Sequence, residues 1–190
     1  MTPHQAVADA FEAVPRAGFV PEDQQRFAHL DRPLPIGWGQ TNSQPTTVRV
    51  MLELLDVRPG QSVLDVGCGS AWTTALLAHL VGPTGSVIGV EIVPELVEVG
   101  RANLAALPLP NARIEPAVPD VLGRPTDAPY DRVLVSAEAG SMPRALVRQL
   151  RVGGVLVIPV AGWMYEVRRT QRLPDVVRHG RFAFVPLIGG

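Results

Sequence analysis

Short apolar runs alternate with amphipathic segments along most of this 190-residue chain. Runs rich in Val, Leu and Ile and bounded by Gly, Pro, Asn or Asp predict buried strands. Apolar residues at helical spacing in the segments between them predict helices. The predicted strands are 62–66, 86–91, 111–117, 132–136 and 155–160, and the predicted helices are 5–13, 46–55, 73–80, 94–107 and 143–150. Strands that alternate with helices through short connections predict an α/β fold with a doubly wound, mostly parallel sheet.

Two stretches depart from this alternation. Residues 165–170 and 181–187 are strand candidates separated by a polar segment, which predicts a C-terminal antiparallel pair and a sheet of about seven strands. Residues 16–45 are rich in Pro, Gly and polar residues and have no sustained periodicity. A span of that length inside a compact domain is usually functional or disordered. Its rigid prolines and apolar anchors favour an ordered active-site loop.

The composition narrows the classes of function. Hydrophobic residues make up 46% of the chain and charged residues 18%, which is typical of a globular protein with a large core. The net charge of −1 and pI near 6.4 provide no basic footprint for nucleic acid or an anionic membrane. No apolar run approaches 18 residues, no signal peptide is visible, and Cys68 is the only cysteine. We therefore expect a cytoplasmic monomer that has no disulfide and binds neither nucleic acid nor membrane. The histidines lack Cys or acidic neighbours at ligand spacing, so no metal site is predicted.

A glycine-rich turn follows the first of the five strands. Gly67 and Gly69 remove the Cβ atoms that would keep backbone N–H groups away from a nucleotide-like ligand. Glu91 ends the next strand 24 residues after Gly67, near the distance at which an acid accepts hydrogen bonds from ribose hydroxyls. A dinucleotide fingerprint would require glycine at position 72, where this chain has Trp72.

The motif Asp65-x-Gly67-x-Gly69-x-Ala71 resembles the acid-x-Gly-x-Gly-x-Gly motif of class I S-adenosylmethionine-dependent methyltransferases, with Ala71 in place of the last glycine. The resemblance implies a Rossmann-like class I methyltransferase fold. It also implies S-adenosylmethionine as the cofactor and S-adenosylhomocysteine as its product. The residues that it assigns to the cofactor are Asp65, Gly67, Gly69, Ser70, Glu91, Ile92 and Asp120.

Further segments resemble the protein-L-isoaspartate (D-aspartate) O-methyltransferase family. The most specific is the loop 31–45, which contains Pro35-Ile36-Gly37-x-Gly39-Gln40-Thr41-Asn42-Ser43-x-Pro45. The other matching segments, in chain order, are Val14-Pro15-Arg16-x-x-Phe19-Val20, Ala128-Pro129-Tyr130-Asp131, the region 143–160 and Phe184-Val185-Pro186-Leu187. We expect a single domain, with an N-terminal helix and substrate loop in residues 1–45 and a cofactor-binding core in residues 46–190.

The family resemblance implies methylation of the carboxylate of isoaspartyl residues in damaged proteins or peptides. Ser43 corresponds to the family's active-site serine, and the resemblance places Gln40, Thr41, Asn42 and Val185 at the substrate. An unperturbed carboxyl has a pKa near 3.9, so the nucleophile is already ionised at neutral pH and needs no strong base. The enzyme must then align carboxylate, methyl group and sulfur. We assign Ser43 to orienting the carboxylate and not to covalent attack.

Some of these residues have simpler structural interpretations. Ser43 could cap the helix that starts near Pro45, and Ser70 could cap the helix after the glycine turn. Asp65 could orient the turn by hydrogen bonds without touching the ligand. Trp38 could line the substrate cleft or only anchor the loop.

Three departures from the family pattern leave alternatives open. Ala71 replaces a glycine, and Asn42 replaces an aliphatic residue. After the third strand, where the resemblance implies Gly-Asp-Gly with its aspartate at the adenine amine, this chain has Val118-Pro119-Asp120-Val121. Asp120 therefore lies one position later than that aspartate, and Pro119 has no N–H to offer. One alternative is a peptide-tailoring enzyme that esterifies an aspartate of a biosynthetic precursor. Another is a degenerate cofactor-binding module without turnover, and a third is a small-molecule methyltransferase.

Overall fold

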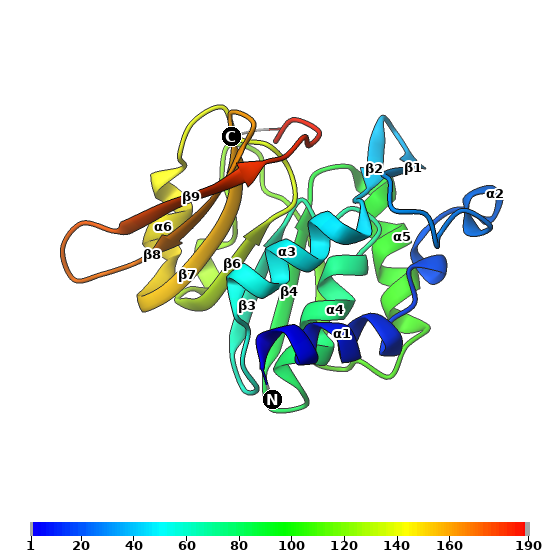
Figure 1. The fold of residues 1–190 in the computed structure, drawn as a ribbon, viewed down its shortest axis with the longest axis horizontal. Coiled ribbons are helices and arrows are strands. Elements are labelled where there is room, and N and C mark those ends of the chain that lie inside the picture. The colour runs from blue at the N-terminus through cyan, green and yellow to red at the C-terminus, as the bar shows by residue number, and fades with distance from the viewer. Residues whose placement is uncertain (1, 189–190) are drawn as a thin grey trace.

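The five apolar runs form five strands of one seven-stranded sheet (Figure 1). The computed structural model describes residues 2–188. The helices are α1 (Pro3–Ala13), η1 (Arg16–Phe19), α2 (Glu22–Gln25), α3 (Pro45–Leu55), α4 (Trp72–Val81), α5 (Pro94–Ala105), η2 (Pro125–Asp127) and α6 (Arg144–Gln149). The strands are β1 (Leu34–Gly37), β2 (Gln40–Asn42), β3 (Ser62–Val66), β4 (Ser86–Glu91), β5 (Ala112–Pro116), β6 (Tyr130–Val135), β7 (Leu150–Val160), β8 (Trp163–Arg168) and β9 (Asp175–Arg181).

The strand order β5-β4-β3-β6-β7-β8-β9 reverses direction between β3 and β6. β3 pairs in parallel with β4 on one side and with β6 on the other, whereas β8 and β9 are antiparallel to their neighbours. In open α/β sheets a ligand binds beyond the carboxyl ends of the strands at such a reversal. The predicted class I methyltransferase fold, with its C-terminal antiparallel pair, is thereby confirmed in topology.

Two apolar layers sandwich the sheet. On one face, α1, α3, α4 and α5 bury side chains against the sheet, and this cluster includes Val63, Leu76 and Leu134. On the other face, α6 and the segment 122–128 cover a second cluster that includes Val133 and Leu156. Both faces of the central strands are buried, which explains why these strands appear in the sequence as continuous apolar runs and not as alternating ones.

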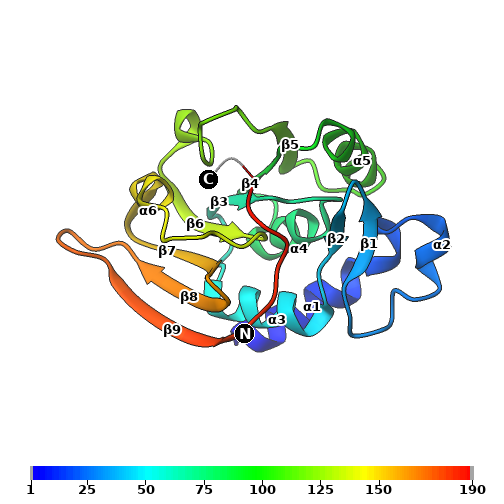
Figure 2. The same cartoon turned by 90° about the horizontal axis from the view of Figure 1, so that it is seen from above.

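The last strand lies earlier in the chain than the apolar pattern predicts. β9 is Asp175–Arg181, a mostly exposed edge strand, so the predicted strand at 181–187 is wrong. An edge strand tolerates charged and polar side chains, which is why residues 171–180 resemble a connection. Residues 182–188 instead cross the carboxyl edge of the sheet as an extended segment (Figure 2). The backbone of Glu138 holds this segment, donating to Val185 and accepting from Leu187 at 2.8 Å each.

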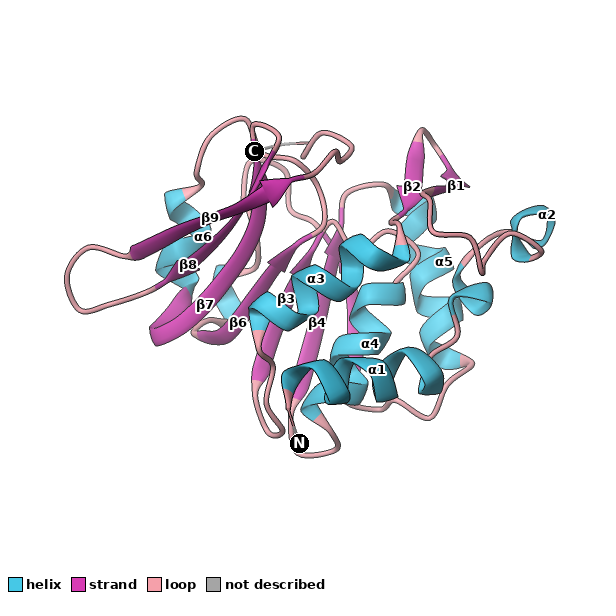
Figure 3. Cartoon of the chain, in the orientation of Figure 1, coloured by secondary structure: helices cyan, strands magenta, loops and turns pink. Residues whose placement is uncertain are grey.

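The loop at residues 16–45 contains short regular elements that its composition does not reveal. β1 and β2 form a two-stranded hairpin beside α5, visible in Figure 3. Leu34 and Ile36 of the hairpin pack against Leu96 of α5 in a small separate cluster. The loop is ordered by these contacts. No helix within residues 2–188 is long and apolar enough to cross a membrane.

Candidate active site

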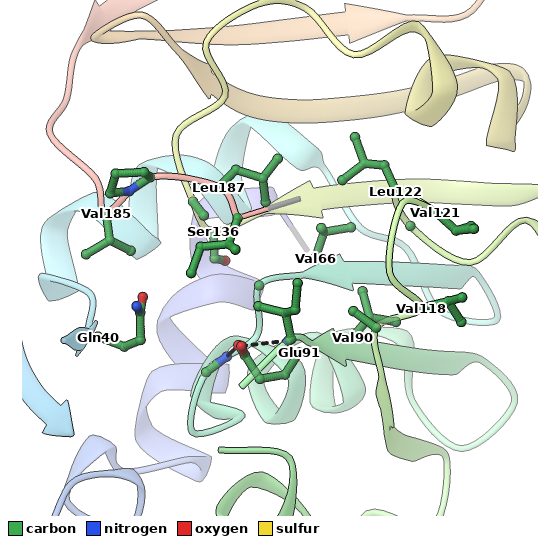
Figure 4. Close-up of a pocket in the computed structure, with 18 of the residues that line it drawn as sticks. Gln40, Val66, Val90, Glu91, Val118, Val121, Leu122, Ser136, Val185 and Leu187 are labelled. Carbon is green, nitrogen blue, oxygen red and sulfur yellow. Dashed lines mark hydrogen bonds between the residues drawn. The ribbon is translucent and has the colours of Figure 1, made fainter. Parts of the chain in front are cut away.

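A pocket of about 730 Å³, including its solvent-open part, lies beyond the carboxyl ends of β3, β4 and β6. Figure 4 shows Gln40 and Val185 at one end of it and Val118, Val121 and Leu122 at the other, with Glu91 below. Its lining combines apolar side chains with a few polar groups, as in small-molecule and cofactor sites. Of the residues predicted to bind cofactor or substrate, Gln40, Thr41, Gly67, Gly69, Glu91, Ile92, Asp120 and Val185 line this pocket.

Glu91 at the end of β4 organises the glycine turn. Its Oε2 accepts a hydrogen bond from the N–H of Gly69 at 2.8 Å, and its Oε1 accepts from the N–H groups of Ile92 and Val93 at 2.7 and 2.9 Å. A carboxylate has about four acceptor positions, so one remains for a ligand hydroxyl. Glu91 therefore both shapes the turn and faces the pocket.

Asp65 lies beneath the turn and lines none of the pockets described in residues 2–188. The hydroxyls of Thr73 and Thr74 donate to its Oδ2 at 2.7 Å each, and Ser136 Oγ donates to its Oδ1 at 3.4 Å. Burial raises the pKa of Asp65 to about 6, although these three hydroxyls counteract the effect. Asp65 is fully buried, with Oδ2 facing the two threonines of α4 and Oδ1 facing Ser136, so this geometry supports the simpler interpretation, in which Asp65 orients the turn, over direct contact with the cofactor.

Ser43 borders a second and a third hollow and not the large pocket. The second is a groove lined by residues that include Ser43, Thr47 and Phe184. The third is a small hollow against the glycine turn, which Ser43 shares with Ser70 and Asn42. The N-cap of α3 is Gln44 without a side-chain cap bond, and Asp31 instead accepts from the N–H and Oγ1 of Thr46 at 2.8 Å. Ser43 therefore does not cap α3, and it faces the space between groove and turn.

Arg16 fastens the loop that carries Ser43. This guanidinium, 6% exposed, donates to the carbonyl oxygens of Arg32, Asn42 and Ser43 at 2.9 Å each and to that of Leu30 at 3.1 Å. Burial lowers the pKa of Arg16 to about 10, so the side chain remains charged at neutral pH. Its carbon Cζ lies 5.4 Å from the centre of the Trp72 ring at the start of α4. One buried cation thus ties both ends of the loop to the helix behind the glycine turn.

The comparisons with known proteins agree with one another. The family model for protein-L-isoaspartate (D-aspartate) O-methyltransferase matches residues 1–190. A protein-L-isoaspartate O-methyltransferase of Methanopyrus kandleri is 48% identical over 189 residues, which cover 96% of this chain and 83% of the relative. The chain belongs to the protein-L-isoaspartate O-methyltransferase family.

Solved structures of the family have the same fold. One protein-L-isoaspartate O-methyltransferase superposes with a TM-score of 0.87 at 22% identity, over 95% of this chain and 60% of that one. A Plasmodium falciparum structure, described as a protein-L-isoaspartate O-methyltransferase in complex with S-adenosyl-L-homocysteine, gives a TM-score of 0.86 at 26% identity. That alignment covers 97% of this chain and 91% of the Plasmodium chain.

The family departure at Ala71 does not narrow the pocket. Ala71 adopts a left-handed backbone conformation with φ +73°, which favours glycine, and it is fully buried. Its Cβ points toward Gly100 of α5, and a Cβ at position 100 would lie only 3.3 Å from it. Because Gly100 has no side chain, the extra methyl group fits between turn and helix. Ala71 is also the N-cap of α4 without a side-chain bond, so Ser70 does not cap this helix.

Asn42 turns inward and joins two other residues of the site. It is 5% exposed, accepts from Arg16 Nε at 2.7 Å through its Oδ1, and donates from Nδ2 to Ser70 Oγ at 3.3 Å. At a position where the family resemblance leads us to expect an aliphatic residue, this chain therefore has a polar link between the substrate loop and the glycine turn. Neither Asn42 nor Ser70 lines the large pocket; both line the small hollow beside it.

Asp120 reaches the pocket through a tight turn. Val121 N–H donates to Val118 O at 3.1 Å, and Asp120 has φ +61° as the third residue of this four-residue turn. Pro119 occupies the second position, where a fixed φ is favourable and no N–H is required. The turn places Asp120 at the rim of the pocket despite its shifted position in the sequence.

Three further observations complete the description of the site. Trp38 is 51% exposed at the tip of the β1–β2 hairpin and lines none of these hollows, so neither role expected for it matches the structure. Residues 2–188 contain no cluster of His, Cys, Asp and Glu arranged to hold a metal ion. Ser136, which sequence reasoning missed, lines the large pocket, the groove and the small hollow. A serine that ends an apolar strand at the reversal of strand order is the signal that could have identified it.

Proposed function

We propose that this chain transfers a methyl group from S-adenosylmethionine to the side-chain or α-carboxylate of isoaspartyl residues in damaged proteins or peptides. Family membership supports the reaction and the substrate class. The observation that carries the proposal structurally is the position of Ser43, between an open groove and the glycine turn. A peptide in the groove would bring its carboxylate toward a cofactor held by the turn.

The large pocket offers chemically distinct ends for the cofactor. Val118, Val121 and Leu122 provide an apolar surface for the adenine ring, and Asp120 provides a nearby acceptor for its amine. Glu91 has acceptor capacity for ribose hydroxyls. The N–H groups of Gly67, Cys68, Gly69 and Ala71 donate within the protein, so the backbone N–H and the hydroxyl of Ser70 would hold the methionine carboxylate. These assignments agree with those implied by the glycine motif, except for Asp65.

The reaction removes two charges. An oxygen lone pair of the carboxylate forms a bond to the methyl carbon, the carbon–sulfur bond breaks, and its electron pair stays on sulfur. A carboxylate and a sulfonium become an ester and a neutral thioether, and no proton is transferred. Since charge decreases toward the transition state, groups that bind the full carboxylate charge strongly would stabilise the starting state more than the transition state.

The lining of the site fits this requirement. Among the described residues that line the pocket, the groove and the small hollow, none is Arg, Lys or His. The side-chain donors in the groove are the hydroxyls of Thr41, Ser43, Thr47 and Ser136 and the neutral amide of Gln44, which already donates to Asp31. Neutral hydroxyls orient a carboxylate with weaker hydrogen bonds than a charged donor makes. Ser43 acts in this proposal as one such orienting group.

The decisive experiment is transfer of labelled methyl from S-adenosylmethionine to a short isoaspartyl peptide, beside its twin with a normal aspartyl residue. We expect methylation of the isoaspartyl peptide alone. Ser43→Ala should lower kcat/KM for the peptide by tenfold or more while S-adenosylhomocysteine still binds, and Ser141→Ala, an exposed serine outside the site, should have no effect. No transfer to either peptide, with cofactor-product binding intact, would refute the proposal.

The alternatives lose part of their support. Asn42, one of the departures from the family pattern that left a dedicated peptide substrate open, does not line the groove, and neither does Trp38. Ala71, which suggested lost turnover, directs its methyl group away from the pocket. Preferential methylation of the normal aspartyl peptide would favour the tailoring enzyme. Binding of S-adenosylhomocysteine without methylation of any peptide would favour the degenerate module.

We also propose that the enzyme works as a cytoplasmic monomer. Its only cysteine, Cys68, is buried and free, as expected in a reducing compartment. Sedimentation of the purified protein would test whether it is a monomer, and cell fractionation would test whether it is cytoplasmic. A dimer with higher specific activity than the monomer would contradict the proposal that the enzyme works as a monomer.

A further inference from the structure

Ser136 occupies the point at which the strand order reverses. It follows Val135, the last residue of β6, and its backbone N–H donates to Val66 O of β3 at 2.8 Å. Its backbone is therefore fixed between the two central strands. The residue is partly exposed, and in Figure 4 its side chain lies between Val185 and Val66.

Three hollows meet at this side chain. Thr41 and Ser136 are the only described residues that line the cofactor pocket, the groove and the small hollow together. Thr41 belongs to the hairpin, on the loop side, and Ser136 belongs to the sheet. Methyl transfer needs donor and acceptor in contact, so it has to occur where the cofactor space and the substrate space join.

The hydroxyl of Ser136 is loosely held. Its one hydrogen-bond partner among the described residues is Asp65 Oδ1, at 3.4 Å, which is long for an O–H···O bond. By contrast, the hydroxyl oxygens of Thr73 and Thr74 each lie 2.7 Å from the other carboxyl oxygen of Asp65, Oδ2. Asp65 thus already has two short donors, and the Ser136 hydroxyl can rotate toward the hollow while the carboxyl group remains hydrogen-bonded.

We propose that Ser136 is a substrate-binding residue whose hydroxyl donates to the isoaspartyl carboxylate, opposite Ser43. This inference rests on the proposed function. One hydroxyl from the loop and one from the sheet would hold the carboxylate from two sides, with an oxygen directed at the methyl group. Both donors are neutral, which keeps the carboxylate reactive as its charge decreases.

The test compares Ser136→Ala with Ser136→Thr, and with Ser141→Ala as the matched serine outside the site. We expect Ser136→Ala to lower kcat/KM for the isoaspartyl peptide about tenfold, with the affinity for S-adenosylhomocysteine changed less than twofold. Ser136→Thr keeps the hydroxyl and should recover activity to within about threefold. Ser141→Ala should match the wild type in both measurements.

Two results would overturn the inference, and both differ from failure of the proposed function. Unchanged peptide kinetics in Ser136→Ala would show that the hydroxyl does not hold the substrate. A loss of S-adenosylhomocysteine affinity equal to the loss of kcat/KM would assign Ser136 to supporting Asp65 and the glycine turn. Failure of the proposed function would appear instead as a wild-type enzyme that does not methylate the isoaspartyl peptide.

Discussion

The cofactor side and the substrate side of the site are held in place by groups of opposite charge. Beneath the glycine turn, the carboxyl groups of Asp65 and Glu91 accept hydrogen bonds from hydroxyls and from backbone N–H groups. Beneath the substrate loop, the guanidinium of Arg16 donates to backbone carbonyls. The two carboxyl groups accept the hydrogen bonds that hold the turn, and the guanidinium donates the hydrogen bonds that hold the loop. A turn held by acids and a loop held by a cation should respond differently to substitution and to pH.

The largest expected effect is on the loop. Arg16→Met leaves buried carbonyls of Arg32, Asn42 and Ser43 without a donor and should lower the free energy of unfolding by about 3 kcal/mol. Peptide methylation should fall at least 100-fold, whereas S-adenosylhomocysteine affinity should change less than threefold. Urea unfolding, peptide kinetics and calorimetric titration measure these quantities. The control is Arg144→Met, at an exposed arginine of α6.

If Arg16→Met weakens S-adenosylhomocysteine binding as much as it weakens catalysis, the loop and the turn are not anchored separately. Loop and turn would then be a single unit, joined through Asn42, Ser70 and Trp72. Hydrogen exchange would show which description holds. Independent anchoring predicts that protection is lost in residues 28–43 and retained in α4.

The next effect concerns pH. Asp65 has a pKa of about 6 in the folded protein and 3.8 as its ordinary value, so between these values the folded state binds more protons than the unfolded state. Its contribution to stability is complete below about pH 4 and is lost as the pH rises through 6. The unfolding free energy of the wild type minus that of Asp65→Asn should therefore increase by up to about 3 kcal/mol between pH 7 and pH 4.

Urea denaturation of both proteins at pH 7, 5.5 and 4.5 checks this sign. Taking the difference removes the opposite contribution of Asp31 and Asp127, whose pKa values are lowered by their hydrogen bonds and, for Asp127, its neighbouring arginines. A difference that is flat with pH would mean that Asp65 is ionised in the folded protein throughout this range.

A smaller effect is expected at the other acid. Glu91→Gln replaces one acceptor oxygen by an NH₂ group, which would face the N–H of Gly69 or those of Ile92 and Val93. We expect S-adenosylhomocysteine to bind about 30-fold more weakly, which corresponds to about 2 kcal/mol. The KM for the peptide should change less than twofold. Calorimetric titration beside Glu12→Gln, an exposed site on α1, measures this; equal affinities in the two variants would contradict it.

The smallest effect tests the fit of Ala71. Ala71→Gly relieves the left-handed strain but adds flexibility to the unfolded chain, so stability should rise by only about 0.5 kcal/mol. S-adenosylhomocysteine affinity should stay within twofold, because the methyl group points toward Gly100. Ala102→Gly, at an exposed position of α5, should instead destabilise. A fivefold gain in affinity on Ala71→Gly would show that the methyl group obstructs the cofactor.

The sequence predicts the parts of this fold that a local pattern determines. β3 and β4 have the predicted boundaries, because each is an apolar run that ends at a turn or an acid. The β9 edge strand escaped prediction because it is polar and exposed. The hairpin escaped because β1 and β2 are only four and three residues long.

The site divides in the same way. The position of Glu91 at the pocket could be predicted from its spacing to the glycine turn, and that of Ser43 beside the groove from the loop motif. The burial of Asp65 could not, since the acid that introduces the motif looks the same whether it faces ligand or helix. Contacts between distant segments leave no local pattern, so the Arg16–Asn42 hydrogen bond, across 26 residues, gave no sign in the sequence.

The extended segment 182–188 has a kinetic consequence. Val185 lines both the cofactor pocket and the groove, and its carbonyl is held by Glu138 at the edge of the sheet. One backbone segment thus forms a wall, or partition, that is shared by two compartments: the pocket proposed for the cofactor and the groove proposed for the peptide. We therefore expect that occupancy of one compartment changes the affinity of the other, so that the order in which cofactor and peptide bind depends on the strip of chain around Val185.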